Sequence, residues 1–382
     1  MLKPENKGPP FKFVVAVGIG SLFGVISLNL APFTIGAFID DLGITQARSG
    51  FLVTAELVVI GLSAILISPT VNKIGIRRTA LLGIIIAITG QLASLLFEQF
   101  GSLLTIRLFT AMGLGLVYAS ANAAGGRAKN PDAVFSLAIT CSLIVVALFL
   151  PGIGAVVGHF GYRGIVLAVA AFLLISAPTL IWLVPKEASS STLTSKADVL
   201  KTTDLFLLIA MIAFFNVGTG AAWTFMERVG IVKLGLPSEQ VGLILGMGTF
   251  AGIFGALSVS WLSKRVGRLY PIIAGLSIGG ISSFFIVSGL DIASYIIGGL
   301  LFWGSYMLIY PYSIALGSDL DKSGRGATIA AGMTMMSFAV GPMVGAQILT
   351  VSSFYILALF CFGSCLLAAI ISLPLIRSLN SR

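Results

Sequence analysis

The sequence predicts an all-helical membrane protein with twelve transmembrane helices in two pseudosymmetric bundles of six. Two observations on composition lead to this fold class: 57% of the residues are hydrophobic and only 10% are charged. The third is the spacing of polar segments, which leaves apolar runs long enough to cross a bilayer, a length of about 20 residues for a helix. A soluble domain would carry about 25% charged residues, so composition alone places the chain in the membrane.

Each apolar run defines one predicted span. In the first half the spans are predicted at 11–38, 47–70, 78–97, 102–125, 133–158 and 164–184. In the second half they are predicted at 203–227, 239–262, 270–289, 293–316, 326–350 and 353–376, with the break TVSSF near 350 as the weakest boundary. The Ser-, Thr- and Lys-rich stretch between the halves predicts a flexible cytoplasmic linker. The predicted domains are therefore residues 1–184 and 203–382, joined by the linker 185–202.

The distribution of positive charge predicts the orientation, because cytoplasmic loops of membrane proteins carry an excess of Lys and Arg. With the N-terminus inside, eighteen of the 23 Lys and Arg residues fall on the cytoplasmic side. Both termini are therefore predicted to be cytoplasmic. The net charge of +9 is interpreted as topological, since the basic residues form no stripe with interleaved aromatics that would indicate nucleic-acid binding.

Two similar basic loops indicate an internal repeat, namely VNKIGIRR at 71–78 and SKRVGR at 263–268. Three pairs of residues keep nearly the same separation: Gly75 with Gly267 at 192, Pro151 with Pro342 at 191, and Tyr118 with Tyr310 at 192. Repeats of this kind in membrane proteins are typical of transporters built from two bundles around a central site.

The loop SPTVNKIGIRR, from Ser68 to Arg78, resembles the signature G-x-L-A-D-R-x-G-R-[RK] of the major facilitator superfamily. Further likenesses are RLFTAMGLG from Arg107, and LNLAPFTI in the first span, which resembles an element of the family's drug and metabolite exporters. The resemblance covers the whole chain and implies alternating access with gating loops on the cytoplasmic side. The gating residues it implies are Asn72, Lys73, Gly75, Arg77, Arg78, Lys264, Arg265, Gly267 and Arg268.

Two ionisable residues are predicted inside the membrane, Glu56 in the second span and Arg107 in the fourth. A charge there costs about 2.5 to 3.5 kcal/mol, so such residues are functional candidates. One hypothesis is proton coupling, with Glu56 alternately protonated and ionised beside Arg107; another is a structural ion pair. The resemblance adds a third, in which Arg107 anchors an anionic substrate. Glu227, beside Arg228 at an outer helix end, is interpreted as half of an exposed pair.

The resemblance also implies that spans one, four, seven and ten line the substrate cavity. Polar and aromatic residues on these spans suit an amphipathic or aromatic organic solute, because rings stack and amides orient polar groups. Some of the same rings could instead face lipid or fill helix contacts. The candidate substrate-binding residues are Asn29, Arg107, Tyr118, Asn122, Asn216, Trp223, Trp303, Tyr306 and Tyr310.

The sequence argues against an enzyme, since it has no H-E-x-x-H motif and no phosphate-binding P-loop. No cofactor or metal is expected, and the three cysteines, all in apolar spans, are interpreted as packing residues. The predicted function is proton-coupled export of a small solute by a secondary active transporter. Alternatives are coupled or facilitated uptake of a small organic anion, and a membrane sensor that does not transport. We expect a monomer in a bacterial inner membrane, with solute, protons and the bilayer as partners.

Overall fold

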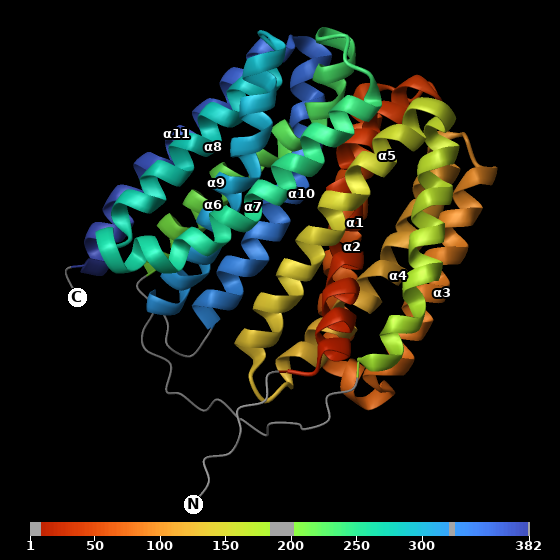
Figure 1. The fold of residues 1–382 in the computed structure, drawn as a ribbon, viewed down its shortest axis with the longest axis horizontal. Coiled ribbons are helices and arrows are strands. Elements are labelled where there is room, and N and C mark those ends of the chain that lie inside the picture. Colours follow the sequence, from red (N-terminus) through yellow and green to blue (C-terminus); the bar gives the residue numbers. More distant parts are fainter. Residues whose placement is uncertain (1–8, 184–201, 321–324, 381–382) are drawn as a thin grey trace, which may run out of the picture. The chain divides into compact units, whose positions relative to one another are not determined.

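The computed structural model describes residues 9–183, 202–320 and 325–380, which are almost entirely helical and contain no strand (Figure 1). The helices are α1 (Phe11–Asp40), α2 (Gln46–Ile74), α3 (Ile76–Ala93), α4 (Phe100–Gly126), α5 (Pro131–Ser176), α6 (Thr202–Arg228), α7 (Ser238–Val266), α8 (Leu269–Ser288), α9 (Ile292–Leu320), α10 (Arg325–Val351) and α11 (Phe354–Asn380). In the described ranges, 11 helices are long and apolar enough to cross a membrane. The predicted all-helical membrane fold is confirmed.

Helix α5 contains two of the predicted spans. It is 46 residues long, and inside it Gly161 leaves the helical conformation with φ 53° and ψ −141°. A Cβ on Gly164 would lie 3.0 Å from the carbonyl oxygen of Val156, although residues eight apart in a continuous helix are about 12 Å apart along its axis. The chain therefore turns back at Gly161, and with α5 counted as two limbs the described ranges contain twelve segments that could cross a membrane.

The chain forms two compact units, and helices α1, α2 and α5 contribute to both. The first unit is drawn from Met1–Ser27, Glu56–Val145 and Val166–Thr192, and the second from Leu28–Ala55, Val146–Ile165 and Leu193–Arg382. The predicted division into residues 1–184 and 203–382 follows the repeat rather than this packing, and it stays a prediction. The predicted linker at 185–202 lies outside the described residues, except for Thr202, which begins α6.

In the first unit, glycines allow α3 and α4 to pack backbone against backbone. A Cβ on Gly83 would lie 2.6 Å from the carbonyl oxygen of Gly113, and a Cβ on Gly113 would lie 2.5 Å from that of Gly83. No residue with a side chain fits either position without a shift of the helices. This close contact fixes α3 and α4 relative to each other, and both helices carry residues of the candidate site.

In the second unit, α6, α8, α9, α10 and α11 surround an apolar core. Its buried members include Phe215, Leu276, Tyr312 and Cys365. The predicted packing role of the cysteines agrees with the burial of Cys361 and Cys365. The core holds α6 and α9 side by side, and these two helices carry most of the aromatic residues discussed below.

Two helix–helix contacts of the second unit are related to each other by the internal repeat. A Cβ on Gly242 of α7 would lie 2.8 Å from the Leu150 carbonyl of α5, and one on Gly50 of α2 would lie 2.6 Å from the Pro342 carbonyl of α10. Gly50 and Gly242 are 192 residues apart, as are Leu150 and Pro342. The period found in the sequence is thus also the period of close helix packing.

Candidate functional site

Glu56 and Arg107 form a buried ion pair in the first unit. The Nε of Arg107 donates to one carboxylate oxygen of Glu56 at 2.5 Å, and its Nη2 donates to the other at 2.8 Å. Arg107 Nη1 donates to the side-chain oxygen of Gln91 on α3 at 2.9 Å. Glu56 is 2% exposed and Arg107 is 7% exposed. The two side chains therefore pair directly, and Gln91, which the sequence did not single out, completes the arrangement.

The geometry of this pair limits what it can do chemically. Bidentate pairing satisfies both carboxylate oxygens, and removal of one partner of such a buried pair costs about 3 to 5 kcal/mol. An anionic substrate at Arg107 would have to displace Glu56 from the guanidinium group. The arrangement thus ties α2, α3 and α4 together, and the coupling role predicted for Glu56 stays a prediction.

A second polar contact, in the second unit, follows from a proline in α1. Pro32 has no backbone N–H, so the Leu28 carbonyl four residues earlier loses its helical donor. The indole Nε1 of Trp223 on α6 donates to this carbonyl oxygen at 2.8 Å. Trp223 is fully buried. A residue predicted to touch substrate therefore completes the hydrogen bonding of a kinked helix.

Trp223 belongs to a continuous cluster of aromatic side chains. Its ring stacks on Phe302 with centroids 5.9 Å apart and meets Trp303 edge-on at 5.1 Å. Trp303 in turn meets Tyr306 edge-on at 5.3 Å. The cluster ends at α6 and α10, where Tyr306 stacks on Phe215 at 5.9 Å and meets Phe338 at 5.6 Å. Within this aromatic cluster, Phe215, Phe302 and Phe338 had no sequence signal beyond their hydrophobicity.

Besides the Trp223 indole, the aromatic cluster brings together polar groups of Tyr306, Asn216 and Trp303. The Tyr306 hydroxyl donates to Asn216 Oδ1 at 3.0 Å, while Asn216 Nδ2 donates to the Ile212 carbonyl at 2.8 Å. The Nε1 of Trp303 is buried and has no hydrogen-bond partner in the structure. Leaving a buried donor unpaired costs about 1 to 3 kcal/mol, so this N–H is available to an acceptor that enters the cluster.

The other predicted lining residues are divided between the units. Asn29 of α1 is buried and Tyr310 of α9 is half-buried, both in the second unit. Tyr118 and Asn122 of α4 lie in the first unit, where Asn122 Nδ2 donates to the Tyr118 carbonyl at 3.0 Å. The second unit thus gathers six of the nine predicted residues.

The interpretation of Glu227 as half of an exposed pair is wrong. Glu227 is 2% exposed, and Arg228 instead pairs with Asp40 at the end of α1, with its Nη1 2.5 Å from Asp40 Oδ2. The Oε2 atom of Glu227 is buried without a hydrogen-bond partner. A Cβ on Gly36 of α1 would lie 2.6 Å from that oxygen. The backbone of α1 therefore covers the carboxyl group of Glu227. The position of Glu227 at the end of a predicted span gave no indication of this burial.

Each of the two basic loops contains a glycine with a positive φ angle. Gly75 has φ 102° and Gly267 has φ 69°, and a Cβ at either position would meet nothing within 4 Å. Glycine is therefore needed for the backbone angle and not for space. Arg77 Nη2 donates to the Ile181 carbonyl at 2.6 Å, and Arg268 pairs with Asp319 at the end of α9.

The remaining gating residues take simpler positions. Lys73 and Arg78 are exposed, and Arg265 lies over the Trp261 ring at 4.4 Å in a cation–π contact. The side chains of Asn72 and Lys264 lie outside the described part of the chain. Both loops are thus held to the end of another helix by an arginine.

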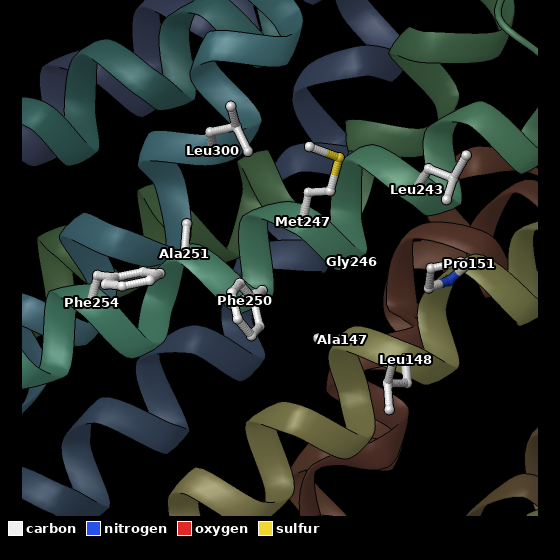
Figure 2. A pocket seen from close by; sticks show the side chains of 10 residues that line it. All are labelled: Ala147, Leu148, Pro151, Leu243, Gly246, Met247, Phe250, Ala251, Phe254 and Leu300. Carbon is white, nitrogen blue, oxygen red and sulfur yellow. The ribbon is translucent and has the colours of Figure 1, made fainter.

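A groove of about 390 Å³ lies between α5 and α7 in the second unit (Figure 2). It is lined by Ala147, Leu148, Pro151, Leu243, Gly246, Met247, Phe250, Ala251, Phe254 and Leu300. All of these residues are apolar, and Leu148 and Phe254 are largely exposed. Solute sites need a few polar groups that fix orientation. The groove therefore lacks such groups, whereas the aromatic cluster contains them.

The chain has helices of membrane length, an internal repeat, and buried polar groups on helices that contain proline. These features together are typical of a membrane transporter. Residues 17–337 match the family model of the Major Facilitator Superfamily, and the chain belongs to this family. No protein with a curated description matches the sequence.

Among solved structures, the chain is similar to the crystal structure of the nucleoside transporter NupG. The TM-score is 0.76 at 9% sequence identity, with 96% of this chain and 98% of that chain covered. A mutant of NupG gives a TM-score of 0.67 at 10% identity, over 95% of this chain and 99% of that chain. The likeness confirms the predicted fold, and the family match agrees with the prediction that the chain is not an enzyme.

Proposed function

We propose that this protein is a secondary active transporter that moves a small aromatic or amphipathic organic solute by alternating access, coupled to protons. The observation that carries the proposal is the aromatic cluster with its free Trp303 N–H. Stacked and edge-on rings favour a planar solute, and the indole N–H next to the Tyr306–Asn216 pair would orient a polar edge of that solute.

A nucleoside is one member of this solute class, because it joins a planar base to polar edges. The name of the solved relative NupG makes a nucleoside a natural probe. Other members are aromatic cations and aromatic acids, which differ from a nucleoside in charge. The proposed class is therefore defined by a flat ring with at least one hydrogen-bond acceptor, and probes of different charge will divide it.

Alternating access would act on the contacts of the second unit. Thr54 Oγ1 of α2 accepts a hydrogen bond from the Met343 N–H of α10 at 3.1 Å, next to the Gly50–Pro342 contact of the same helices, and the repeat-related contact joins Gly242 of α7 to Leu150 of α5. These helix ends are predicted from charge to face away from the cytoplasm. Their packing would close that end, and parting them would open it, while the arginine-held loops at 75 and 267 would gate the other end.

Export is the direction we propose, because the first span resembles exporter sequences. Uptake of an organic anion is less well supported, since the Arg107 guanidinium group already donates three hydrogen bonds to Glu56 and Gln91. Both termini in the cytoplasm, a bacterial inner membrane and a monomer complete the proposal. A sensor that does not transport would not need the unpaired N–H of Trp303 in the aromatic cluster.

The proposal can be tested with purified protein in liposomes and radiolabelled uridine, ethidium and benzoate as probes. We expect saturable flux of at least one probe. Trp303→Phe keeps an aromatic ring and removes the N–H. We expect this variant to bind the transported probe about fivefold to tenfold more weakly, in line with loss of one hydrogen bond. Phe225→Leu, at a fully buried ring of α6 outside the aromatic cluster, is the matched control for a general packing defect, and it should change stability more than the affinity for the probe. Equal affinities in wild type and Trp303→Phe would contradict the proposed site.

A further inference from the structure

The carboxyl group of Glu227 lies in a setting unlike that of any other described acidic residue. It stands at the end of α6, it is 2% exposed, and its Oε2 atom has no hydrogen-bond partner. The α1 backbone at Gly36 covers it so closely that a Cβ there would lie 2.6 Å from Oε2 and 3.2 Å from Oε1. Any water or cation that served an ionised carboxylate would have to enter between α1 and α6.

The charged and titratable groups around Glu227 are engaged elsewhere. Arg228, on the same helix, directs Nη1 to both carboxylate oxygens of Asp40, at 2.6 and 2.5 Å. Asp41, which follows the last residue of α1, accepts a hydrogen bond from the Tyr162 backbone N–H at 2.5 Å. The Tyr295 hydroxyl of α9 donates to the Met226 carbonyl at 2.9 Å.

The packing gives an ionised Glu227 little compensation for its burial. Arg228 shares its charge with Asp40 through the ion pair. A carboxylate buried with an unpaired oxygen is therefore expected to hold a proton in this packed arrangement.

We propose that Glu227 is a proton-binding site whose protonation favours the packing of α1 against α6. One carboxylate binds one proton and becomes a neutral acid, which tolerates the dry contact with Gly36. When the proton leaves, the carboxylate needs water, so α1 and α6 separate at this end. A proton thus acts as a ligand that binds one conformation better than the other, which is the requirement for coupling.

Glu56 makes a useful contrast within the same chain. It is as deeply buried as Glu227, at 2%, but both of its oxygens accept hydrogen bonds from Arg107. Glu56 therefore has a cation paired with both of its oxygens, which Glu227 lacks. The inference rests on the proposed proton-coupled transport, and it names the residue that binds the proton.

Infrared spectroscopy of the purified protein tests the inference without any solute. Wild type at neutral pH should show the carbonyl-stretch band of a buried protonated carboxylic acid, shifted in D₂O, and Glu227→Gln should lose it. Glu56→Gln is the matched control and should keep it. Glu227→Asp retains a titratable group, so it should shift the frequency of the band and not remove it. This variant replaces Glu227→Gln in the test if Glu227→Gln does not fold. The inference is overturned if wild type lacks the band or if Glu227→Gln retains it.

Hydrogen exchange tests the link to conformation. Amides of Leu28–Asp40 in wild type should exchange faster as the pH rises and Glu227 loses its proton, after correction for the intrinsic pH dependence of exchange. In Glu227→Gln this additional pH dependence should vanish; its persistence would overturn the proposed link. Neither measurement requires transport. Failure to move any probe in liposomes would therefore count against the proposed function alone, and a missing infrared band against Glu227 alone.

Discussion

The contact between Trp223 and the kink in α1 yields a prediction that can be worked out in energy. Trp223→Phe removes the indole N–H that donates to the Leu28 carbonyl, and a buried carbonyl left unpaired costs about 1 to 3 kcal/mol. The smaller ring also leaves about 40 Å³ empty, which at about 24 cal/mol per Å³ adds about 1 kcal/mol. We therefore expect Trp223→Phe to lower the free energy of unfolding by about 2 to 4 kcal/mol.

Pro32→Ala separates the two contributions, because an alanine at this position supplies the N–H that the helix lacks. In that background the Leu28 carbonyl regains a helical donor, so Trp223→Phe should cost only the cavity term of about 1 kcal/mol. The coupling energy of the double-mutant cycle should be about 1 to 3 kcal/mol. The assay is unfolding in mixed detergent micelles titrated with SDS and followed by far-ultraviolet circular dichroism.

A second proline provides the control for this cycle. Pro374 lies inside α11, on a different helix from the Leu28 carbonyl. Pro374→Ala should therefore be additive with Trp223→Phe to within about 0.5 kcal/mol. The reasoning is refuted if Trp223→Phe costs the same in the wild-type and Pro32→Ala backgrounds, because the indole N–H would then contribute nothing at the kink.

Three further predictions concern other parts of the chain. Glu56→Gln should lower the free energy of unfolding by about 3 to 5 kcal/mol, because Arg107 is left buried without its partner; a loss below about 1 kcal/mol in the same SDS titration would show that the pair contributes little. Gly75→Ala should lower the free energy of unfolding by about 1 to 3 kcal/mol, because Gly75 has a positive φ. Gly363→Ala is the control in α11, where a Cβ would meet open space, and it should raise the free energy of unfolding by about 0.5 to 1 kcal/mol. Gly242→Ala should loosen the contact with α5, raising hydrogen exchange in Val146–Ile165, and unchanged exchange would contradict the close approach.

The helices could be predicted from the sequence because a membrane span is defined by length and apolar composition, both of which are local. The spans predicted at 47–70 and 239–262 became α2 and α7 with ends that differ by a few residues. The turn at Gly161 also followed, since HFGYRG separates two apolar runs. The basic loops were assigned to helix junctions because glycine and clustered charge interrupt the apolar pattern.

The candidate site could be predicted only in part, because pairing depends on tertiary contacts. Two opposite charges at similar depth indicated that Glu56 and Arg107 might meet, and they do. Gln91 gave no signal, since a lone amide in a span fits many environments. Glu227 was misjudged because its burial is caused by Gly36, a residue on another helix whose lack of a side chain is visible only in the packed structure.

Half of the Trp223 contact could be predicted from the sequence by asking which backbone carbonyls lack a hydrogen-bond donor. Pro32 inside a span implies a carbonyl without a donor at Leu28, and buried carbonyls seek donors. The sequence therefore contains the need for a partner. It does not contain the partner's identity, because several spans carry side chains able to donate a hydrogen bond at a similar depth.

Proton coupling is the central claim, and the most direct measurement is the internal pH of liposomes that contain the protein while uridine, ethidium and benzoate are added in turn. Wild type should move protons when, and only when, a probe moves. Glu227→Gln should abolish that proton movement in a folded protein, and Glu227→Asp should retain part of it. Flux of a probe in wild type without any change in internal pH would contradict the account and identify a facilitator.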